Sequence, residues 1–499
     1  MLTASLAFSP DHVLAPVRRR LFGSFVEHLG RCVYTGIHEP GHPTADEDGF
    51  RGDVLDLTRE MGVEVVRYPG GNFVSGYRWE DGVGPVADRP VRRDLAWRSI
   101  ETNEVGVDEF ARWARKAGAE VMYAVNLGTR GVAEALDVHE YLNHERGTQL
   151  SDLRRANGTE EPHGVRLWCL GNELDGPWQT GHKTAHEYGR LAAETARALR
   201  QAEPGLELVA CGSSNSQMPT FGQWESTVLE LCYDLVDHIS LHAYYEPLDG
   251  DVDSFLASAV DMDRFIDRVV ATADAVGARL KSDKRITLSF DEWNVWYLSR
   301  FQADPPTEWL VAPRLIEDTY DVTDAVVVGS LLISLLRHAD RVAVACQAQL
   351  VNVIAPIRAE PGGPAWRQTT FHPFALTSRL ARGQVLRTAV DAPTLPTARF
   401  GDVPVVDAVA TRDDDGGTTV FAVNRHRTEP VELRVPAGDA RTAEAWLLHD
   451  PDPSAANTEQ DPDRVVPRPH RTEVADGVLR VVLPPVSWCA VTLGGSTAP

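Results

Sequence analysis

The sequence predicts an α/β protein with a (β/α)8 barrel in residues 16–383, an antiparallel β-sandwich in residues 384–499, and an N-terminal strand in residues 1–15 that joins the sandwich. Three observations predict this fold. A chain of 499 residues exceeds the usual size of one hydrophobic core. Up to about residue 375, strand-like segments alternate with segments of helical period. Beyond residue 383, only short strand-like segments follow one another.

The barrel prediction depends on the number of strand-like segments. Alternating apolar residues such as Ile286, Leu288 and Phe290 are typical of a strand. Eight such segments occur, at residues 21–27, 64–68, 120–126, 166–170, 207–211, 238–242, 286–291 and 341–345. Between them, a helical period is clearest in residues 107–117, 184–202, 260–276 and 322–337. Eight strands with crossovers favour a closed barrel over an open doubly wound sheet, for which no dinucleotide-binding fingerprint is present.

The C-terminal part is predicted to be all-β. Its strand-like segments are short and are separated by Gly, Pro and Asp, which is the spacing of an antiparallel sandwich. We expect strands at residues 403–411, 418–424, 431–435, 443–448 and 478–483, and an exposed acidic, Pro-rich loop at residues 450–463. Residues 2–8 form one further short strand that is expected to pair with this domain.

Charge and patterning exclude several classes of partner. The chain carries 49 Lys and Arg against 72 Asp and Glu, a formal net charge of −23. Because nucleic-acid-binding surfaces are basic, we expect no nucleic-acid partner and instead a neutral or cationic small ligand. No apolar stretch is long enough to cross a bilayer, so no membrane partner is expected. The N-terminus lacks the pattern of a signal peptide, which predicts a cytoplasmic protein.

Cysteine and histidine spacing predicts no metal site and no cofactor. The six cysteines include no CxxC pair, and several lie in apolar strand patterns, so we expect buried thiols rather than disulfides or metal ligands. The histidines show no metal-binding spacing and are interpreted as structural. They are His28, His238, His242, His338 and His372.

Polar residues collect where the predicted strands end. In a barrel of this kind, the active site lies at the C-terminal ends of the strands. Seven of the eight ends carry polar groups, several with aromatic residues beside them, and this is the composition of a sugar pocket. The ends are Glu27-His28, residues 67–72, Asn126, Asn172-Glu173, residues 242–245, Asp291-Glu292 and residues 347–349.

Two carboxylates, Glu173 and Glu292, fit the chemistry of glycoside hydrolysis. Hydrolysis with retention requires one acid that protonates the leaving oxygen and one carboxylate that attacks the anomeric carbon. Glu173 follows the fourth strand and Glu292 the seventh, so the barrel brings them to one mouth. Asn172, directly before Glu173, is placed to bind the 2-hydroxyl of the sugar.

Three neighbouring positions have alternative interpretations. Glu27 is either a ligand contact or an ion-pair partner of Arg67. Tyr244, one strand before Glu292, is expected to donate a hydrogen bond to that carboxylate rather than only cap the barrel. Trp97 lies in a loop, where it either stacks on sugar or packs the loop.

Eight longer stretches of the sequence permit comparison with known families. They are GSFVEHLGRCVYTGI (from Gly23), RYPGGNFVSGYRWEDGVGP (from Arg67), LAWRSIETNEVG (from Leu95), AVNLGTRG (from Ala124), WCLGNELDGPWQTGHK (from Trp168), SLHAYY (from Ser240), LSFDEWNVWY (from Leu288) and AQLVNVIAPI (from Ala348). In this combination and order, the stretches closely resemble the α-L-arabinofuranosidases of glycoside hydrolase family 51.

The resemblance implies roles for eleven residues. It implies that Glu173 is the general acid/base and Glu292 the nucleophile, while Asp291 supports the strand end and neighbouring loops. The arabinofuranose pocket would be lined by Glu27, Arg67, Asn72, Asn172, Tyr244 and Gln349. Arg67 and Tyr244 would hold the nucleophile ionised, and Trp97 and Trp296 would shape the entrance. Family members are soluble, metal-independent and often hexameric, so a homo-oligomer is expected.

The function expected from these observations is that of a retaining exo-α-L-arabinofuranosidase. It would release terminal non-reducing arabinofuranosyl residues from arabino-oligosaccharides and arabinoxylan fragments. An endo-glucanase or a β-xylosidase of the same clan is the nearest alternative, because two acids alone do not fix the sugar. A metal-dependent sugar isomerase and a non-catalytic sugar-binding protein are the alternatives from other classes.

Overall fold

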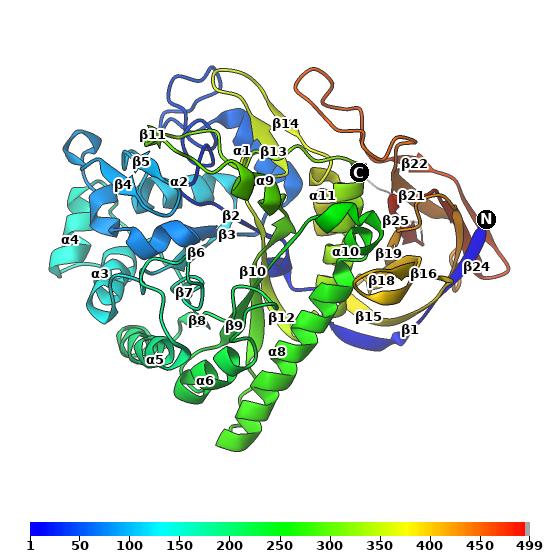
Figure 1. The fold of residues 1–499 in the computed structure, drawn as a ribbon, viewed down its shortest axis with the longest axis horizontal. Helices are drawn as coiled ribbons and strands as arrows, with labels where there is room; N and C mark the ends of the chain where they lie inside the picture. The colour runs from blue at the N-terminus through cyan, green and yellow to red at the C-terminus, as the bar shows by residue number, and fades with distance from the viewer. Residues whose placement is uncertain (495–499) are drawn as a thin grey trace.

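A closed barrel of eight parallel strands lies at the left of Figure 1. The computed structural model describes residues 1–494. All eight predicted strands are present, and each pairs in parallel with its neighbours in the order β10-β12-β2-β3-β6-β7-β8-β9. This confirms the predicted fold class. The strands are β2 (Gly23–Phe25), β3 (Val65–Tyr68), β6 (Glu120–Ala124), β7 (Leu167–Leu170), β8 (Glu207–Ala210), β9 (His238–Tyr245), β10 (Thr287–Val295) and β12 (Val342–Ala348).

The four helices predicted from their period are also present. They are α2 (Val107–Ala117), α5 (Ala185–Ala202), α8 (Ala259–Leu280) and α10 (Val322–Arg337). In α2, Val107, Phe110 and Trp113 form a buried stripe, and the Glu109 carboxylate accepts a hydrogen bond from the backbone of Gly106 at the start of the helix (2.9 Å). The remaining α-helices of the described residues are α1 (Gly52–Met61), α3 (Val132–Asn143), α4 (Gln149–Ala156), α6 (Gln223–Cys232), α7 (Val252–Leu256), α9 (Leu298–Ala303) and α11 (Phe371–Leu380).

Two strand boundaries differ from the prediction in ways that matter for the site. Strand β10 continues to Val295, because its last residues pair with an equally extended β9 through Val295 and Tyr245. Asp291 and Glu292 therefore lie inside the strand, next to a register shift against β9, and not beyond its end. Strand β2 is shorter than the predicted segment 21–27, since a 3-10 turn occupies Arg19–Leu21. Glu27 consequently lies just past the end of its strand.

The second part of the molecule is a ten-stranded sheet at the right of Figure 1. It rolls up, since β21 near one edge contacts β23 at the other. Strand β1 lies inside this sheet between β15 and β20, and its pairing with β20 is parallel. These pairings support the proposed division of the chain after residues 15 and 383. The strands are β1 (Leu2–Pro16), β15 (Gln384–Asp391), β18 (Val406–Arg412), β19 (Thr418–Asn424), β20 (Val431–Pro436), β21 (Ala443–Leu448), β22 (Arg468–His470), β23 (Thr472–Ala475), β24 (Val478–Leu483) and β25 (Ser487–Leu493).

Three small sheets complete the strands of the described residues. One consists of β4 (Arg92–Asp94), β5 (Ser99–Glu101) and β11 (Leu310–Val311), and it joins the loop after β3 to the loop after β10. The others are the hairpins of β13 (Ile357–Ala359) with β14 (Ala365–Arg367) and of β16 (Thr394–Thr397) with β17 (Gly401–Pro404).

Helix α10 connects the barrel to the ten-stranded sheet. It packs against α8, α11 and β10 on the barrel side and against β18, β19 and β25 on the sheet side. All of its residues from Asp324 to Leu336 are buried. Asp407 of β18 forms ion pairs with Arg337 of α10 and with Arg425, and Arg425 also donates to Ser330 Oγ (3.2 Å). The two parts therefore share an interface that is apolar and also carries buried charge.

The acidic loop at residues 450–463 is not simply exposed as predicted. Its Ala455 and Asn457 are buried, and Val322 and Thr323 donate backbone hydrogen bonds to the carbonyls of Ala455 and Pro453. The loop therefore docks on the first turn of α10, where those N–H groups have no partner within the helix.

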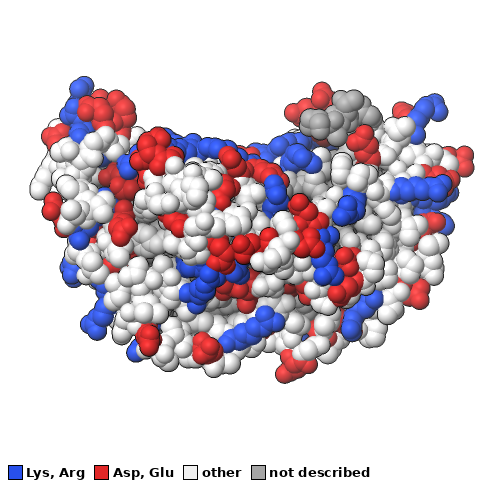
Figure 2. All heavy atoms as spheres, turned by 90° about the horizontal axis from the view of Figure 1, so that it is seen from above, with Lys and Arg blue, Asp and Glu red and all other residues white. Residues whose placement is uncertain are grey.

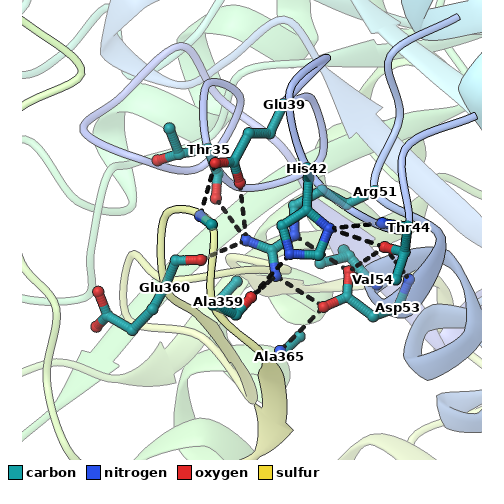
Figure 3. A network of polar contacts seen from close by, with 12 residues as sticks. Thr35, Glu39, His42, Thr44, Arg51, Asp53, Val54, Ala359, Glu360 and Ala365 are labelled. Atoms are coloured by element: carbon teal, nitrogen blue, oxygen red, sulfur yellow. Dashed lines mark hydrogen bonds and ion pairs between the residues drawn. The ribbon is translucent and has the colours of Figure 1, made fainter.

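The long connection between β2 and α1 is fixed by Arg51, which is fully buried (Figure 3). Its guanidinium pairs with the carboxylates of Glu39 (3.0 Å) and Asp53 (2.7 Å). It also donates to the carbonyls of Glu360 and Gly363, both at 2.7 Å, in the β13–β14 hairpin. One side chain thus ties the connection between β2 and α1 to the β13–β14 hairpin, and its charge is paired on both sides.

The remaining expectations concern the surface and the thiols. Figure 2 shows acidic and basic side chains interspersed over one face of the molecule. Among the described residues, no helix is both long and apolar enough to cross a membrane. All six cysteines are buried and unpaired, which confirms the interpretation of their spacing.

Candidate active site

Glu173 and Glu292 meet at the C-terminal mouth of the barrel. Glu173 follows β7, and Glu292 lies in β10. Both are buried, with 9 % and 5 % of their surface exposed. One oxygen of each carboxyl group lies within 4.8 Å of the other and of a ring nitrogen of His242. The backbone of Glu173 has φ of 45°, in the left-handed region, a strained conformation that is commonly found at functional sites.

Each oxygen of the Glu292 carboxylate accepts a hydrogen bond from a different side chain. Arg67 Nη1 donates to Oε1 at 2.6 Å, and the Tyr244 hydroxyl donates to Oε2 at 2.8 Å. The second contact confirms the hydrogen bond predicted for Tyr244. Burial and the charge of Glu292 keep the pKa of Tyr244 well above its usual value, so its hydroxyl remains a donor. Charge-assisted bonds of this kind stabilise the ionised form of a carboxylate.

Arg67 on β3 also orients two amides. Its Nη2 donates to Asn172 Oδ1 at 2.7 Å, and this leaves Asn172 Nδ2 to donate to Asn72 Oδ1 at 3.2 Å. Desolvation opposes the charge of the buried Arg67, but Asp291 and Glu292 outweigh it and raise the pKa of the guanidinium. The arginine therefore stays charged and fixes both the carboxylate and the amides beside it.

Three donors hold the carboxylate of Glu27. Its Oε1 accepts from the Phe73 backbone (2.8 Å) and from Trp97 Nε1 (2.9 Å), and its Oε2 accepts from Gln349 Nε2 (3.2 Å). Of the two interpretations left open, the ion pair with Arg67 is not formed. Burial, and then the nearby charge of Glu292, raise the pKa of Glu27 to about 8, although the donors favour its charged form. Among the described residues, Gln349 Oε1 is buried without a hydrogen-bond partner.

An aromatic row connects Trp97 to Tyr244. Trp97 packs edge-on against Phe301 at 6.1 Å, Phe301 lies 6.3 Å from Trp296, and Trp296 packs edge-on against Tyr244 at 5.1 Å. Trp97 is 7 % exposed. It therefore both packs its loop and positions Glu27, while Trp296 is half-buried.

His242 belongs to the site, although the sequence analysis interpreted it as structural. Its Nδ1 donates to Glu173 Oε1 at 2.8 Å and lies 3.5 Å from Glu292 Oε2, while Nε2 donates to Asp291 Oδ1 at 3.1 Å. Desolvation alone would lower the pKa of His242. Its three carboxylate neighbours outweigh this and raise the pKa to about 10, so the ring is a cation. The sequence could have indicated this position, because His242 and Tyr244 are residues i and i+2 of one strand and therefore face the same side.

Asp291 has partners different from those expected. It was predicted to support the strand end and nearby loops. Its carboxylate instead lies inside the barrel, where it contacts His242 and is 3.6 Å from both Arg67 Nε and Cys169 Sγ. Against the opposing effect of burial, the charge of Arg67 lowers the pKa of Asp291, so it remains ionised.

Trp178 is a second residue that the sequence analysis did not single out. Its Nε1 donates to Glu173 Oε2 at 2.8 Å, and half of its surface is exposed. It lies in an irregular loop five residues after Glu173, where no periodicity marks it. In the sequence, Trp178 could have been noticed only as an aromatic residue in a loop close to Glu173.

The barrel and the paired carboxylates at its mouth define a glycoside hydrolase, and comparisons with known proteins identify the family. The family models described as the α-L-arabinofuranosidase 1 domain and the α-L-arabinofuranosidase C-terminal domain match residues 57–263 and 291–487. An intracellular exo-α-(1→5)-L-arabinofuranosidase of Streptomyces lividans is 63% identical over 98% of this chain and 75% of its own. An exo-α-(1→6)-L-arabinofuranosidase of Bifidobacterium longum is 57% identical over 97% and 96%.

A solved structure agrees with these sequence matches. AbfB, a family 51 α-L-arabinofuranosidase from Bifidobacterium longum, superposes with a TM-score of 0.95, at 51% identity over 99% of this chain and 100% of its own. The chain therefore belongs to the α-L-arabinofuranosidases of glycoside hydrolase family 51. It is an enzyme of that class.

Proposed function

We propose that this enzyme is a retaining exo-acting α-L-arabinofuranosidase that releases terminal non-reducing residues from arabino-oligosaccharides and arabinoxylan fragments. The observation that carries the proposal is the close approach of oxygens of Glu173 and Glu292, within 4.8 Å. Retaining enzymes hold their two carboxyl groups about 5–5.5 Å apart, whereas inverting enzymes need about 6.5–9.5 Å to fit a water molecule. The short separation supports retention.

In the first step, Glu292 attacks the anomeric carbon while Glu173 protonates the glycosidic oxygen. Arg67 and Tyr244 hold the attacking carboxylate ionised and aimed, because each bonds a different oxygen. The product of this step is a covalent arabinosyl-enzyme and a free leaving group.

In the second step, Glu173 removes a proton from water, which attacks the anomeric carbon and releases arabinose. Glu173 must therefore lose and regain a proton in each cycle. The cationic ring of His242 and the indole N–H of Trp178 both donate to its carboxyl group. These contacts hold the group in one orientation.

The sugar is held by polar groups that follow four barrel strands. Glu27, Asn72 and Asn172 follow β2, β3 and β7, and Gln349, after β12, donates to Glu27 (3.2 Å). Trp97 and Trp296 form the aromatic side of the entrance. Only one arabinofuranosyl ring is proposed to enter this pocket, which is the basis of exo-action.

Azide rescue tests the roles of the two acids. With Glu292→Ala, azide should take the place of the nucleophile and yield the inverted β-arabinosyl azide. With Glu173→Ala, azide should attack the arabinosyl-enzyme and yield the retained α product. NMR of the two products decides, and finding them exchanged would refute the assignment.

Substrate comparison tests the sugar and the linkage. We expect an aryl α-L-arabinofuranoside to be hydrolysed far faster than an aryl β-D-xyloside or a mixed-linkage glucan, and the reverse order would favour the clan alternative. The two relatives above are named for (1→5) and (1→6) linkages. Disaccharides with each linkage should therefore be compared, with arabinose release as the readout.

We propose that no metal takes part. Glu173, His242 and Glu292 are close enough to hold an ion, but His242 would first have to lose its proton, because its pKa is about 10. Full activity after dialysis against a chelator is expected, and loss restored by a divalent cation would favour an isomerase-like site. Sugar binding without turnover in the parent protein would instead indicate a binding protein.

We also propose a cytoplasmic protein, by analogy with relatives that are named intracellular, and a homo-oligomer, which the family resemblance implies. Light scattering coupled to size-exclusion chromatography measures the assembly directly. A mass six times that of the 54.8 kDa chain would support the hexamer implied by the family resemblance.

A further inference from the structure

We propose that a cleft beside the active site binds the leaving-group portion of the glycoside and favours one that carries a uronic acid. The cleft has a volume of about 610 Å³, and Glu27, Glu173 and Glu292 are not among its lining residues. Ligand clefts commonly have volumes of about 300–1,000 Å³, so this one is large enough for a short oligosaccharide. The inference rests on the proposed glycosidase function, since the cleft serves the same substrate.

Loops from the mouth of the barrel form the cleft. Its walls come from the loop after β3, including Phe73 and Arg78, from Thr129 and Arg130 after β6, and from Thr180 after β7. Because these loops all follow C-terminal strand ends, the cleft opens on the same face of the barrel as the active site.

The cleft begins on the side where the leaving group departs. Glu173 protonates the leaving oxygen, so the leaving group lies next to Glu173 and to Trp178, which bonds it. Two residues after Trp178, Thr180 lines the cleft. Gln179, between them, donates to the carbonyl of Asn72 (3.5 Å) and to the hydroxyl of Ser75, which fixes this loop against the opposite wall. A chain that leaves the catalytic pocket past Trp178 therefore meets the cleft next.

Two arginines of the cleft have free charges. Arg92 and Arg130 also line it, but they pair with Asp81 (2.8 Å) and Glu80 (2.5 Å). Arg78 and Arg93 are exposed, and neither forms an ion pair or donates a side-chain hydrogen bond to any residue of the described chain. Arg93 only lies over the ring of Trp309, 5.5 Å from its centroid. Two unpaired guanidinium groups favour an anion.

The lining also carries four carboxylates, those of Asp81, Asp94, Glu101 and Glu134. Asp81 pairs with Arg92, Glu101 with His28 and Glu134 with Arg130, and Asp94 accepts hydrogen bonds from the backbone of its own loop. Carboxylate oxygens accept from sugar hydroxyl groups. The lining therefore offers acceptors for hydroxyl groups beside the two arginines without an ion-pair partner.

The anion that fits these observations is a sugar carboxylate. The chain as a whole has a charge of −23 and repels anions at long range, so a local pair of free arginines acts by contact rather than by steering. Arginine binds carboxylates through two parallel hydrogen bonds, while the acidic side chains of the lining accept from hydroxyl groups. A uronic acid within an oligosaccharide supplies both.

The test compares two arabinosylated oligosaccharides of equal length, one with a uronic acid and one with a neutral hexose in the leaving-group portion. We expect kcat/KM of the parent enzyme to be about 5- to 20-fold higher for the uronate substrate at low salt, as for one or two charge-assisted contacts, with the preference shrinking at 1 M salt. In Arg78→Ala and Arg78→Glu, the ratio of the two kcat/KM values should fall toward one and below one. Arg190→Ala, which removes an exposed arginine of α5 on the outside of the barrel, is the control and should leave the ratio unchanged.

Binding provides a second measurement that does not depend on turnover. In Glu173→Gln, calorimetric titration with the same two oligosaccharides should show tighter binding of the uronate substrate, and Arg78→Ala in that background should abolish the difference. Equal kcat/KM values for both substrates, insensitive to salt and to Arg78, would overturn the proposal while hydrolysis of an aryl α-L-arabinofuranoside left the glycosidase function intact. A change of oligomeric mass in Arg78→Glu, without a change in the ratio, would overturn it in favour of an interface between copies.

Discussion

At the scale of single residues, the site is organised by charge balance. Three carboxylates, those of Glu173, Asp291 and Glu292, lie around two cations, Arg67 and His242. Each cation contacts Asp291 and one or both of the proposed catalytic acids. Buried acids at this separation would otherwise repel one another and take up protons. Asp291 thus acts on the reaction only through Arg67 and His242, as a positioning residue.

The hydroxyl of Tyr244 gives the first prediction at this scale. Tyr244→Phe removes one of the two donors to Glu292 and should lower kcat/KM for an aryl α-L-arabinofuranoside about 10- to 100-fold, the usual worth of a hydrogen bond to a charged group. Tyr245→Phe is a matched control, because the next residue of β9 faces away from the site and its hydroxyl lies beside Asp261 instead. Equal losses in the two variants would contradict the role of Tyr244.

The cation at His242 gives a prediction about stability and pH. Its pKa is raised from 6.5 to about 10 in the folded protein, so its favourable contribution is complete below about pH 6.5 and is lost as the pH rises toward 10. The difference in free energy of unfolding between the parent and His242→Gln should therefore be largest near pH 6 and should shrink by up to a few kcal/mol by pH 10. Urea unfolding of both proteins across this range measures it. A difference that does not vary with pH would mean that the ring is neutral.

At the scale of elements, α10 has the most demanding surroundings. Its faces are covered by barrel helices on one side and by sheet strands on the other, so no residue in its middle tolerates extra volume. At Gly329, the helix lies directly against a side chain of the sheet. A Cβ atom built there would lie 2.1 Å from Cδ1 of Trp488 in β25, and the glycine is what allows that indole ring to lie on the helix.

Gly329→Ala is accordingly expected to destabilise the protein. Although alanine favours a helix more than glycine does, the clash with Trp488 forces ring or helix to shift, and we expect a net loss of about 1–3 kcal/mol. Gly41→Ala is the matched control, because its Cβ atom would meet nothing within 4 Å and should change stability by less than about 0.5 kcal/mol. Thermal unfolding of the two variants compares them, and an increase in stability of Gly329→Ala would show that the interface is looser than its packing indicates.

At the scale of the whole molecule, most of the fold could be predicted from the periodic pattern of apolar residues. The eight barrel strands and the helices at residues 107–117 and 322–337 were predicted because buried faces impose a period on the sequence. The ends of strands were not predicted as well. Strands β9 and β10 continue beyond the predicted ends because each pairs with the other, and such pairing is a property of the assembled sheet.

In the site too, some residues could be predicted from the sequence and others could not. Glu173 and Glu292 could be brought together from the order of the strands alone, since a barrel gathers all C-terminal ends. The ion pairs of His242 could not be predicted, because they depend on which side chains point into the barrel at the same height along its axis. Trp178 lies in an irregular loop whose path is set by contacts of Gln179 with distant residues, and no local pattern encodes such a path.

The shared core predicts that the barrel and the ten-stranded sheet unfold together. Phe421, Val423 and Trp488 of the sheet belong to the same continuous apolar cluster as the barrel core, and α10 would lose half of its cover if the sheet opened alone. Scanning calorimetry should show one transition with equal calorimetric and van't Hoff enthalpies. Trp488→Ala should lower the temperature of that single transition by several degrees, as for a large aromatic core truncation. Two separate transitions, with only the first affected by the substitution, would mean that the sheet folds independently of the barrel.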